Sequence, residues 1–234
     1  MPPTTSRYDG LADWYDGWNE PNAARNAAQV LDLLGPGKGL CLDLGCGTGH
    51  YFGVLSATGR TVVGLDRSAD QLRIARGRSH HIMQADAAAM PFPDDTFAAV
   101  AALWISTDVD DFAAVLAEAA RVLVPGGLLA FYGVHPCFNG PHTQSIEDGG
   151  ILAHPGYRRA GWHQQSPWWG HNIRSRSGMR HRPLAELVNA FISGGLIIEH
   201  VAEPGDRPVP VNLAIRARKP PVVPAGNQAR SLEG

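Results

Sequence analysis

The chain has 234 residues, of which 44% are hydrophobic and 18% charged, and its formal net charge is −2. This length fits one globular α/β domain that buries a full sheet between helices. With no basic excess, no secretory signal and no run near the roughly 20 apolar residues of a membrane span, we expect a cytoplasmic protein that binds neither nucleic acid nor membrane.

Helices and strands alternate through the first half of the chain. Apolar residues at helical spacing predict a helix over 22–34, and Gly35-Pro36-Gly37 ends it. The short apolar run 39–44 predicts a buried parallel strand. Further along we expect helices over 51–57, 69–76 and 110–123, and strands over 60–65, 81–85, 97–103 and 128–134. This alternation is typical of a doubly wound α/β fold.

The second half of the chain is less regular. Residues 135–180 show no clear period, which predicts a lid or binding loop. A helix over 183–192 and strands over 196–201 and 209–217 follow. We therefore expect one domain over 1–218, made of an N-terminal cap (1–34), a cofactor-binding core (35–134), an inserted lid (135–180) and a C-terminal helix with strands (181–218). The Pro- and Gly-rich tail 219–234 is expected to be disordered.

A glycine cluster follows the first predicted strand, in the sequence LDLGCGTGH. Its glycines are Gly45, Gly47 and Gly49, which gives the spacing G-x-G-x-G. A dinucleotide site expects G-x-G-x-x-G, and His50 occupies the sixth position here. A phosphate-binding loop needs a lysine directly after its last glycine, and none is present. The spacing therefore argues against both kinds of site.

The segment LDLGCGTG resembles the first motif of the class I S-adenosylmethionine-dependent methyltransferases, [VIL]-[LV]-D-[LV]-G-C-G-x-G. Three later segments, VVGLDRS, QADAAAMPFPDDTF and RVLVPGGLLAF, resemble further motifs of this family at fitting intervals, as does YDGLADWYDGW at the N-terminus. The resemblance covers roughly residues 8–134. It implies a Rossmann-like, mostly parallel seven-stranded sheet, S-adenosyl-L-methionine as cofactor, and methyl transfer to a small molecule.

The resemblance also implies where the cofactor binds. Glycines let the backbone pass close under the methionine part, near the Asp43 carboxylate. Asp66 ends the second strand, where a carboxylate accepts two hydrogen bonds from ribose hydroxyls. Asp86 follows the third strand, where the family binds the adenine amino group. The expected cofactor contacts are Tyr8, Tyr15, Asp43, Gly45, Cys46, Gly47, Asp66, Arg67, Asp86, Ala87 and Leu103.

The methyl acceptor is expected to bind along the aperiodic segment. His135 and Asn139 follow the fifth strand directly and His181 precedes the last helix, so these three are the catalytic candidates. The candidates for substrate binding are Trp104, Trp168, Trp169, His171 and Arg180. The alternative is structural: the tryptophans pack a helical subdomain, and the arginines are solvated or bridge to carboxylates. Irregular histidine spacing and three cysteines without a CxxC pair predict no metal site.

We expect methyl transfer to an O, N or C nucleophile of a small molecule. The first alternative keeps the cofactor but uses it for cyclisation or cleavage, because an aromatic-rich lid also stabilises cations. A nicotinamide-dependent oxidoreductase and a non-catalytic binding module are further alternatives. The sequence identifies neither the methyl acceptor nor the oligomeric state, and a homodimer is one of the states that it allows.

Overall fold

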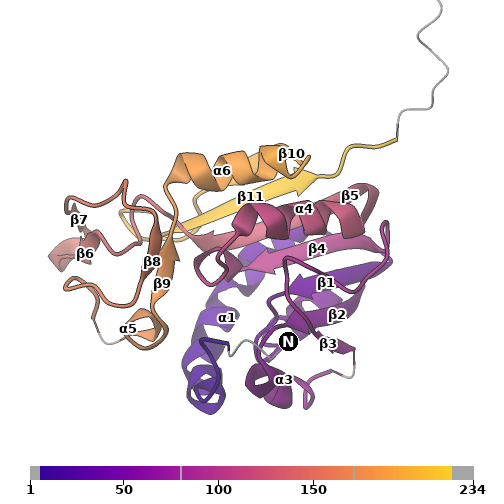
Figure 1. The fold of residues 1–234 in the computed structure, drawn as a ribbon, viewed down its shortest axis with the longest axis horizontal. Coiled ribbons are helices and arrows are strands. Elements are labelled where there is room, and N and C mark those ends of the chain that lie inside the picture. The colour runs from indigo at the N-terminus through magenta and orange to yellow at the C-terminus, as the bar shows by residue number, and fades with distance from the viewer. Residues whose placement is uncertain (1–5, 80, 171, 223–234) are drawn as a thin grey trace, which may run out of the picture.

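A seven-stranded sheet runs through the centre of the computed structural model, which describes residues 6–79, 81–170 and 172–222 (Figure 1). The strand order is β10-β11-β5-β4-β1-β2-β3. Neighbouring strands from β3 to β5 pair in parallel, and β11 is antiparallel to both its neighbours. The bounds are β1 Leu40–Leu44, β2 Thr61–Asp66, β3 Ile82–Gln84, β4 Phe97–Leu103, β5 Leu123–Val134, β10 Ile197–Ala202 and β11 Asn212–Arg218. The predicted fold class is confirmed.

Helices cover both faces of the sheet. One face carries α1 (Ala12–Leu34), α2 (Phe52–Ser56) and α3 (Ala69–Ala75), and the other carries α4 (Phe112–Val122) and α6 (Leu184–Ser193) (Figure 1). Successive β4 side chains point to opposite faces: Val100 packs in the core beneath α4 and Ala101 in the core beneath α1. Because both faces are covered, this strand is apolar along its whole length.

The structure differs from the predicted elements at two places. Helix α1 begins at Ala12 rather than at residue 22 and continues through Pro21. Aromatic packing supports the added turns, since Trp14 stacks on Trp18 with ring centroids 5.8 Å apart. Strand β5 begins at Leu123 rather than at residue 128, because a register shift opposite 97–99 accommodates its Pro-Gly-Gly sequence.

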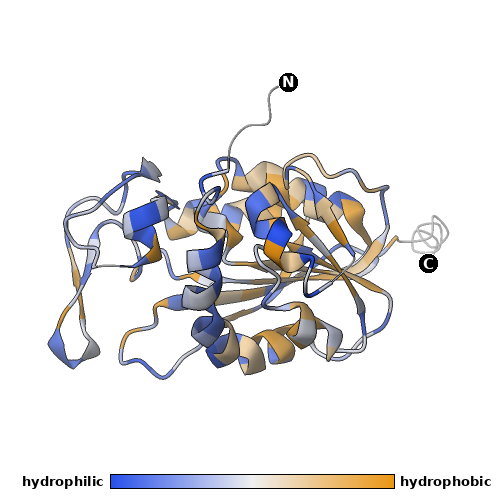
Figure 2. Cartoon of the chain, turned by 90° about the horizontal axis from the view of Figure 1, so that it is seen from below, coloured by the Kyte–Doolittle hydropathy of each residue, from blue (hydrophilic) through white to orange (hydrophobic). Residues whose placement is uncertain are grey.

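Residues 135–180, predicted to be an aperiodic lid, contain short regular elements. Two hairpins form, β6 (Thr143–Ser145) with β7 (Ile151–Ala153) and β8 (Gly161–His163) with β9 (Met179–His181). A short helix, α5 (Ile173–Ser177), and a 3-10 turn, η2 (Glu147–Gly149), complete the segment, and a second 3-10 turn, η1 (Ile105–Thr107), follows β4. The segment lies at one end of the sheet (Figure 1), and polar residues prevail in it, whereas hydrophobic residues concentrate in the sheet and its helices (Figure 2). Strands of three residues are too short to produce a recognisable alternation of apolar and polar residues in the sequence.

The start of the predicted C-terminal tail is held in place. The Lys219 backbone N–H donates to the carbonyl of Gly127 (3.0 Å), and its ammonium group lies 2.6 Å from Asp95. The expectation of disorder is therefore wrong for Lys219, and residues 223–234 lie outside the described part. Within 6–79, 81–170 and 172–222, no helix combines the length and hydropathy of a membrane span.

Candidate active site

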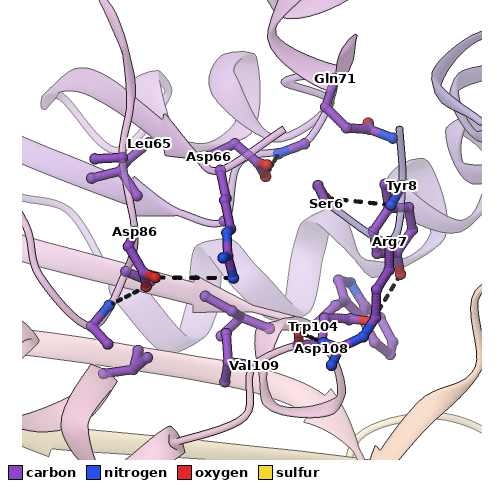
Figure 3. A pocket seen from close by; sticks show the side chains of 18 of the residues that line it. Ser6, Arg7, Tyr8, Leu65, Asp66, Gln71, Asp86, Trp104, Asp108 and Val109 are labelled. Carbon is purple, nitrogen blue, oxygen red and sulfur yellow. Dashed lines mark hydrogen bonds and ion pairs between the residues drawn. The ribbon is translucent and has the colours of Figure 1, made fainter. Parts of the chain in front are cut away.

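A cavity of about 480 Å³ opens at the carboxyl ends of β1, β2, β3 and β4, and we call it the first cavity (Figure 3). Its volume lies within the roughly 300–1,000 Å³ common for ligand pockets. The parallel strands explain its place, because their ends meet at one edge of the sheet. Nine of the eleven expected cofactor contacts line it: Tyr8, Tyr15, Gly45, Gly47, Asp66, Arg67, Asp86, Ala87 and Leu103.

The glycine turn after β1 forms the floor of the first cavity. Gly45 and Gly47 have φ angles of +76° and +54°, which side chains rarely tolerate. A β-carbon at Gly45 would also lie 3.0 Å from the Ile105 side chain. Both positions therefore need glycine, and the backbone is left open to a ligand.

Asp66 connects this turn to the end of β2. Its carboxylate accepts hydrogen bonds from the backbone N–H of Gly47 (2.9 Å) and of Ser68 (2.8 Å). A carboxylate has about four lone-pair positions, so Asp66 can still accept a hydrogen bond from a ligand. Burial raises the pKa of Asp66, and backbone hydrogen bonds from Ser68, Gly47 and Arg67 oppose that shift. Asp66 is thus a fixed acceptor at the edge of the cavity.

Asp86 lies at the mouth of the first cavity and is exposed. Its carboxylate accepts a hydrogen bond from the Ala88 backbone N–H (2.9 Å) and lies 4.0 Å from the Arg67 guanidinium. Figure 3 shows Asp66 and Asp86 close together in the cavity wall, both near the ends of neighbouring strands. This pair of carboxylates can accept hydrogen bonds from two parts of one ligand.

Two expected cofactor contacts, Asp43 and Cys46, do not line the first cavity. Asp43 is 2% exposed, and one of its carboxylate oxygens has no hydrogen-bond partner. Burial and the nearby Asp66 carboxylate raise the pKa of Asp43 to about 8. The Cys46 side chain packs in the core beneath α1 beside Phe52. Asp43 lies in β1 and Cys46 in the glycine turn that follows it, and the side chains of both point into the protein.

Gln71 on α3 also lines the first cavity, and the sequence pattern did not single it out. It is 2% exposed, and among the residues that the structure describes neither polar atom of its amide has a hydrogen-bond partner. A β-carbon on Gly47 would lie 3.5 Å from the Gln71 amide oxygen, so the amide borders the glycine turn. An unpaired buried amide is costly, which indicates that a polar ligand satisfies it.

A second cavity of about 990 Å³ adjoins the first, and α1, α5 and the loop 203–212 enclose it. Four residues line both cavities and form what we call the shared wall: Tyr8, Tyr15, Trp104 and Asp108. Two ligands bound in the two cavities would therefore meet at these side chains.

Asp108 is the centre of the shared wall. Its Oδ1 atom accepts hydrogen bonds from the Tyr8 hydroxyl (3.0 Å) and from Arg174 of α5 (3.1 Å). Its Oδ2 atom accepts one from Thr107 (3.0 Å). Burial raises the pKa values of Tyr8 and Tyr15, so both phenols keep their protons. The shared wall thus contains the Asp108 carboxylate and the protonated hydroxyls of Tyr8 and Tyr15.

Trp104 has a strained backbone. Its φ is +64°, in the left-handed region that a bulky residue rarely adopts. Its backbone N–H donates to the backbone carbonyl of Tyr132 (2.6 Å), and its indole N–H donates to the Tyr51 hydroxyl (3.0 Å). Strain held by such contacts is common at functional sites. The structure therefore places Trp104, a predicted substrate contact, firmly between the cavities.

The two catalytic histidine candidates lie outside both cavities, whereas Asn139 lines the second one. In His135, Nε2 lies 2.9 Å from Glu203 and Nδ1 accepts the backbone N–H of Cys137. In His181, Nε2 donates to the Tyr157 carbonyl (2.7 Å). Burial lowers the pKa values of both imidazoles. The expectation that these rings face the ligands is corrected, because burial and local hydrogen bonds hold them in the protein.

The other substrate candidates also lie outside both cavities. Trp168 stacks on His154 with ring centroids 3.5 Å apart, and the Trp169 indole donates to the Gly140 carbonyl (3.4 Å). Arg180 lies 3.5 Å from Asp110. These contacts fit the structural alternative, because the two tryptophans pack within the segment and Arg180 bridges to a carboxylate. The expectation for His171 falls on a residue outside the described part.

Metal ligation has little support in this region. Within the residues that the structure describes, no three His, Cys, Asp or Glu side chains converge as a metal site would require. The imidazoles of His142 and His181 lie near each other, with ring centroids 4.9 Å apart, but no carboxylate or thiol completes a set with them.

Comparison with known proteins identifies the family. A family profile described as a methyltransferase domain matches residues 42–131. The 2-phytyl-1,4-naphtoquinone methyltransferase of Thermosynechococcus vestitus is 39% identical over 155 residues, 60% of this chain and 66% of that protein. The malonyl-[acyl-carrier protein] O-methyltransferase of Serratia marcescens is 37% identical over 102 residues, 41% of this chain and 38% of that protein. The chain therefore spans less than two thirds of the length of these relatives.

A solved structure agrees over a larger share of the fold. The S-adenosylmethionine dependent methyltransferase from Mesorhizobium loti has a TM-score of 0.63 and 25% identity, covering 90% of this chain and 99% of that one. The profile match over 42–131 contains the glycine turn, Asp66 and Asp86 of the first cavity. Residues 42–131 therefore match the methyltransferase domain of the class I S-adenosylmethionine-dependent enzymes, a family whose cofactor is S-adenosyl-L-methionine.

Proposed function

We propose that the protein transfers the methyl group of S-adenosylmethionine to a small-molecule acceptor. The observation that carries this proposal is the contact of the two cavities along the shared wall. When bound, S-adenosylmethionine supplies a methyl carbon activated by a sulfonium. Transfer then depends mainly on alignment of the two ligands and on exclusion of water, which adjoining cavities favour.

The first cavity fits the cofactor. Asp66 would accept hydrogen bonds from the ribose hydroxyls, and Asp86 with Ala87 would contact the adenine. Gly45 and Gly47 would leave room for the methionine part. The unpaired Gln71 amide would donate to and accept from that polar part. Each of these residues lines the same cavity, which is the support for assigning them to one ligand.

The shared wall would orient the acceptor and take up its proton. Asp108 Oδ2 accepts one hydrogen bond within the structure, from Thr107, and so has room for another. A hydroxyl or amine bound in the second cavity can donate to this oxygen. Asp108 would take up the proton that the acceptor loses when its bond to the methyl carbon replaces the carbon–sulfur bond and S-adenosylhomocysteine is left. Tyr15, whose phenol remains protonated, would bind the acceptor as a hydrogen-bond donor, while the Tyr8 hydroxyl donates to Asp108.

The test combines calorimetry with product analysis. We expect the protein to bind S-adenosylmethionine and, with a library of phenols, amines, glycosides and quinones, to release S-adenosylhomocysteine. Asp108→Asn should lower turnover at least tenfold and leave cofactor affinity unchanged, while the exposed Asn189→Asp on α6 should change neither.

Other outcomes of these measurements would support the alternative functions. Release of methylthioadenosine would indicate cleavage of the cofactor. Cofactor binding without turnover on any acceptor would favour a binding module. Binding of NADH in place of S-adenosylmethionine would contradict the proposal.

A further inference from the structure

Helix α1 lines the second cavity with amide side chains. Asn19, Asn22, Asn26 and Gln29 are spaced by three, four and three residues, which places them on one face of the helix. A helix packed on a sheet normally presents apolar residues on that face. The last turns of α1 do so, with Val30 and Leu33 in the core. The amides occupy the part of the helix that borders the cavity.

Three more amides reach the second cavity from distant segments, Asn139, Asn172 and Asn212. Together with the four on α1 they form what we call the amide set. Several of them are held in place: the Tyr132 hydroxyl donates to Asn26 (3.0 Å) and accepts from Asn212 (3.1 Å). The Asn139 amide donates to the Val211 carbonyl (3.3 Å). Fixed amides are suited to recognise a ligand with defined hydrogen-bonding groups.

Asn19 is the buried member that the protein leaves unpaired. It is 8% exposed, and no side-chain hydrogen bond is formed by it within the described part of the chain. A buried amide of this kind has two donors and an acceptor to satisfy. Since it faces the cavity, a ligand there is the natural partner.

The charges around the second cavity balance. Three arginines line it, Arg25, Arg174 and Arg207, and so do three carboxylates, Asp108, Glu203 and Asp206. Arg174 pairs with Asp108 at 3.1 Å, and Glu203 lies 2.9 Å from His135. An anionic ligand would therefore find no excess of positive charge. Neutral donors and acceptors predominate on the surface that a ligand meets.

Aromatic rings provide the apolar part of this surface. Trp18 on α1 and Trp104 of the shared wall both line the second cavity. Such rings favour contact with a ring of the ligand. The amide set surrounds that contact with groups that both donate and accept hydrogen bonds, as hydroxyls and amides of a ligand require.

We propose that the acceptor is a neutral ring compound rich in hydroxyl or amide groups, of which an aryl glycoside is an example; this inference rests on the proposed function above. A long apolar chain would bury the amide set without hydrogen bonds, which is unfavourable. A polyanionic acceptor would lack a compensating charge. The inference therefore separates this chain from relatives whose names state a phytyl-substituted quinone as substrate.

Three probes that share one ring system test the inference. They are 1-naphthyl β-D-glucopyranoside, 2-methyl-1,4-naphthoquinone and 2-naphthoate, each titrated by calorimetry into protein saturated with S-adenosylhomocysteine. We expect the glucoside to bind at least tenfold more tightly than the other two. Equal or tighter binding of the quinone or the naphthoate, or no binding of the glucoside, would overturn the inference.

Substitutions connect the result to the amide set. Asn19→Leu, and separately Asn22→Leu, should weaken glucoside binding at least tenfold, weaken quinone binding less, and leave the affinity for S-adenosylhomocysteine unchanged. Asn189→Leu on the exposed side of α6 is the matched control and should change nothing. Undiminished glucoside binding in both α1 variants would contradict the assignment. If wild-type protein fails to bind S-adenosylhomocysteine, the proposed function itself fails, so the two failures are distinguishable.

Discussion

The first cavity lies at the carboxyl ends of β1, β2, β3 and β4, whereas the second is enclosed mainly by segments outside these strands. In the first, the N–H groups of Gly47 and Ser68 fix Asp66 at the end of β2. In the second, the lining comes from α1, α5 and the loop 203–212. A sheet edge thus fixes the cofactor side of the site, while the acceptor side depends on residues that can change without altering the sheet.

Asp108 connects these two regions. It follows β4 in the sheet, yet its carboxylate binds Tyr8 from the N-terminal segment and Arg174 from the segment after β5. The separation of the two regions is therefore incomplete at this residue. Substitutions at and around Asp108 test how far the regions depend on one another.

The largest expected effect is that of Asp108→Ala. The side chains of Asp108 and Arg174 are 21% and 12% exposed, so loss of the carboxylate leaves a largely buried guanidinium unpaired. We expect the free energy of unfolding to fall by about 3 kcal/mol, the low end for a broken buried pair. Urea denaturation measures this. Asp13→Ala, which breaks an ion pair in solvent, should leave the stability near that of wild type.

Asp66→Ala should act on the first cavity alone. Loss of a charged acceptor should weaken binding of S-adenosylmethionine by about 1–3 kcal/mol, or about 5- to 150-fold. Binding of the naphthyl glucoside should be unchanged, because Asp66 does not line the second cavity. Calorimetry measures both affinities, with the exposed Asp32→Ala on α1 as control. Equal affinity for the cofactor in wild type and Asp66→Ala would count against the assignment of the first cavity.

A smaller effect is expected from Trp104→Phe. The change keeps a ring beside Tyr132 but removes the indole N–H that donates to Tyr51. The free energy of unfolding should fall by about 1 kcal/mol, a typical net value for one hydrogen bond. Tyr51→Phe should cost a similar amount, and the double variant should cost little more than either. Additive losses in this cycle would show that the hydrogen bond does not couple the two residues.

Acid should affect the segment that contains His142 and His181 and the strand that contains Asp43 in opposite directions. Burial lowers the pKa values of His142 and His181. The neutral imidazoles therefore contribute to the free energy of unfolding above about pH 6.5, and this contribution is lost as the pH falls. Burial raises the pKa of Asp43 to about 8. Its contribution to the free energy of unfolding is therefore lost as the pH rises toward 8 and returns as the pH falls. Hydrogen exchange at pH 7.5 and 5.5, corrected for intrinsic rates, measures both regions.

Amides of residues 142–181 should lose protection at pH 5.5, while those of β1 and β2 should keep or gain it. His142→Gln should reduce the pH dependence in the first group only. The same direction of change in both groups would contradict the account of their buried titratable residues.

The sheet could be predicted because its signals are local. Strand β4 has the predicted bounds, since an apolar run between a turn-rich segment and a polar helix start marks both ends. Asp66 and Asp86 could be placed because each follows a strand whose end lies at the same edge. In the sequence, α2 separates Asp66 from the glycine turn, and α2 and α3 separate Asp86 from it.

The acceptor side could not be predicted in the same way. Asp108 and Arg174 are 66 residues apart and meet only because α5 folds back onto the loop after β4. His135 was expected at the ligands since it follows β5, but its ring turns toward Glu203. The amide residues of α1 recur at helical spacing in the sequence, which indicates a polar helix face. A search for the periodicity of apolar residues does not detect this pattern. Side-chain direction after a strand end is a tertiary property.

The most direct test of the account is a crystal structure with S-adenosylhomocysteine. We predict that its adenosine lies in the first cavity, with the ribose hydroxyls on Asp66, and that its sulfur faces the shared wall of Tyr8, Tyr15, Trp104 and Asp108. Adenosine bound in the second cavity, or a sulfur directed away from the shared wall, would contradict the account.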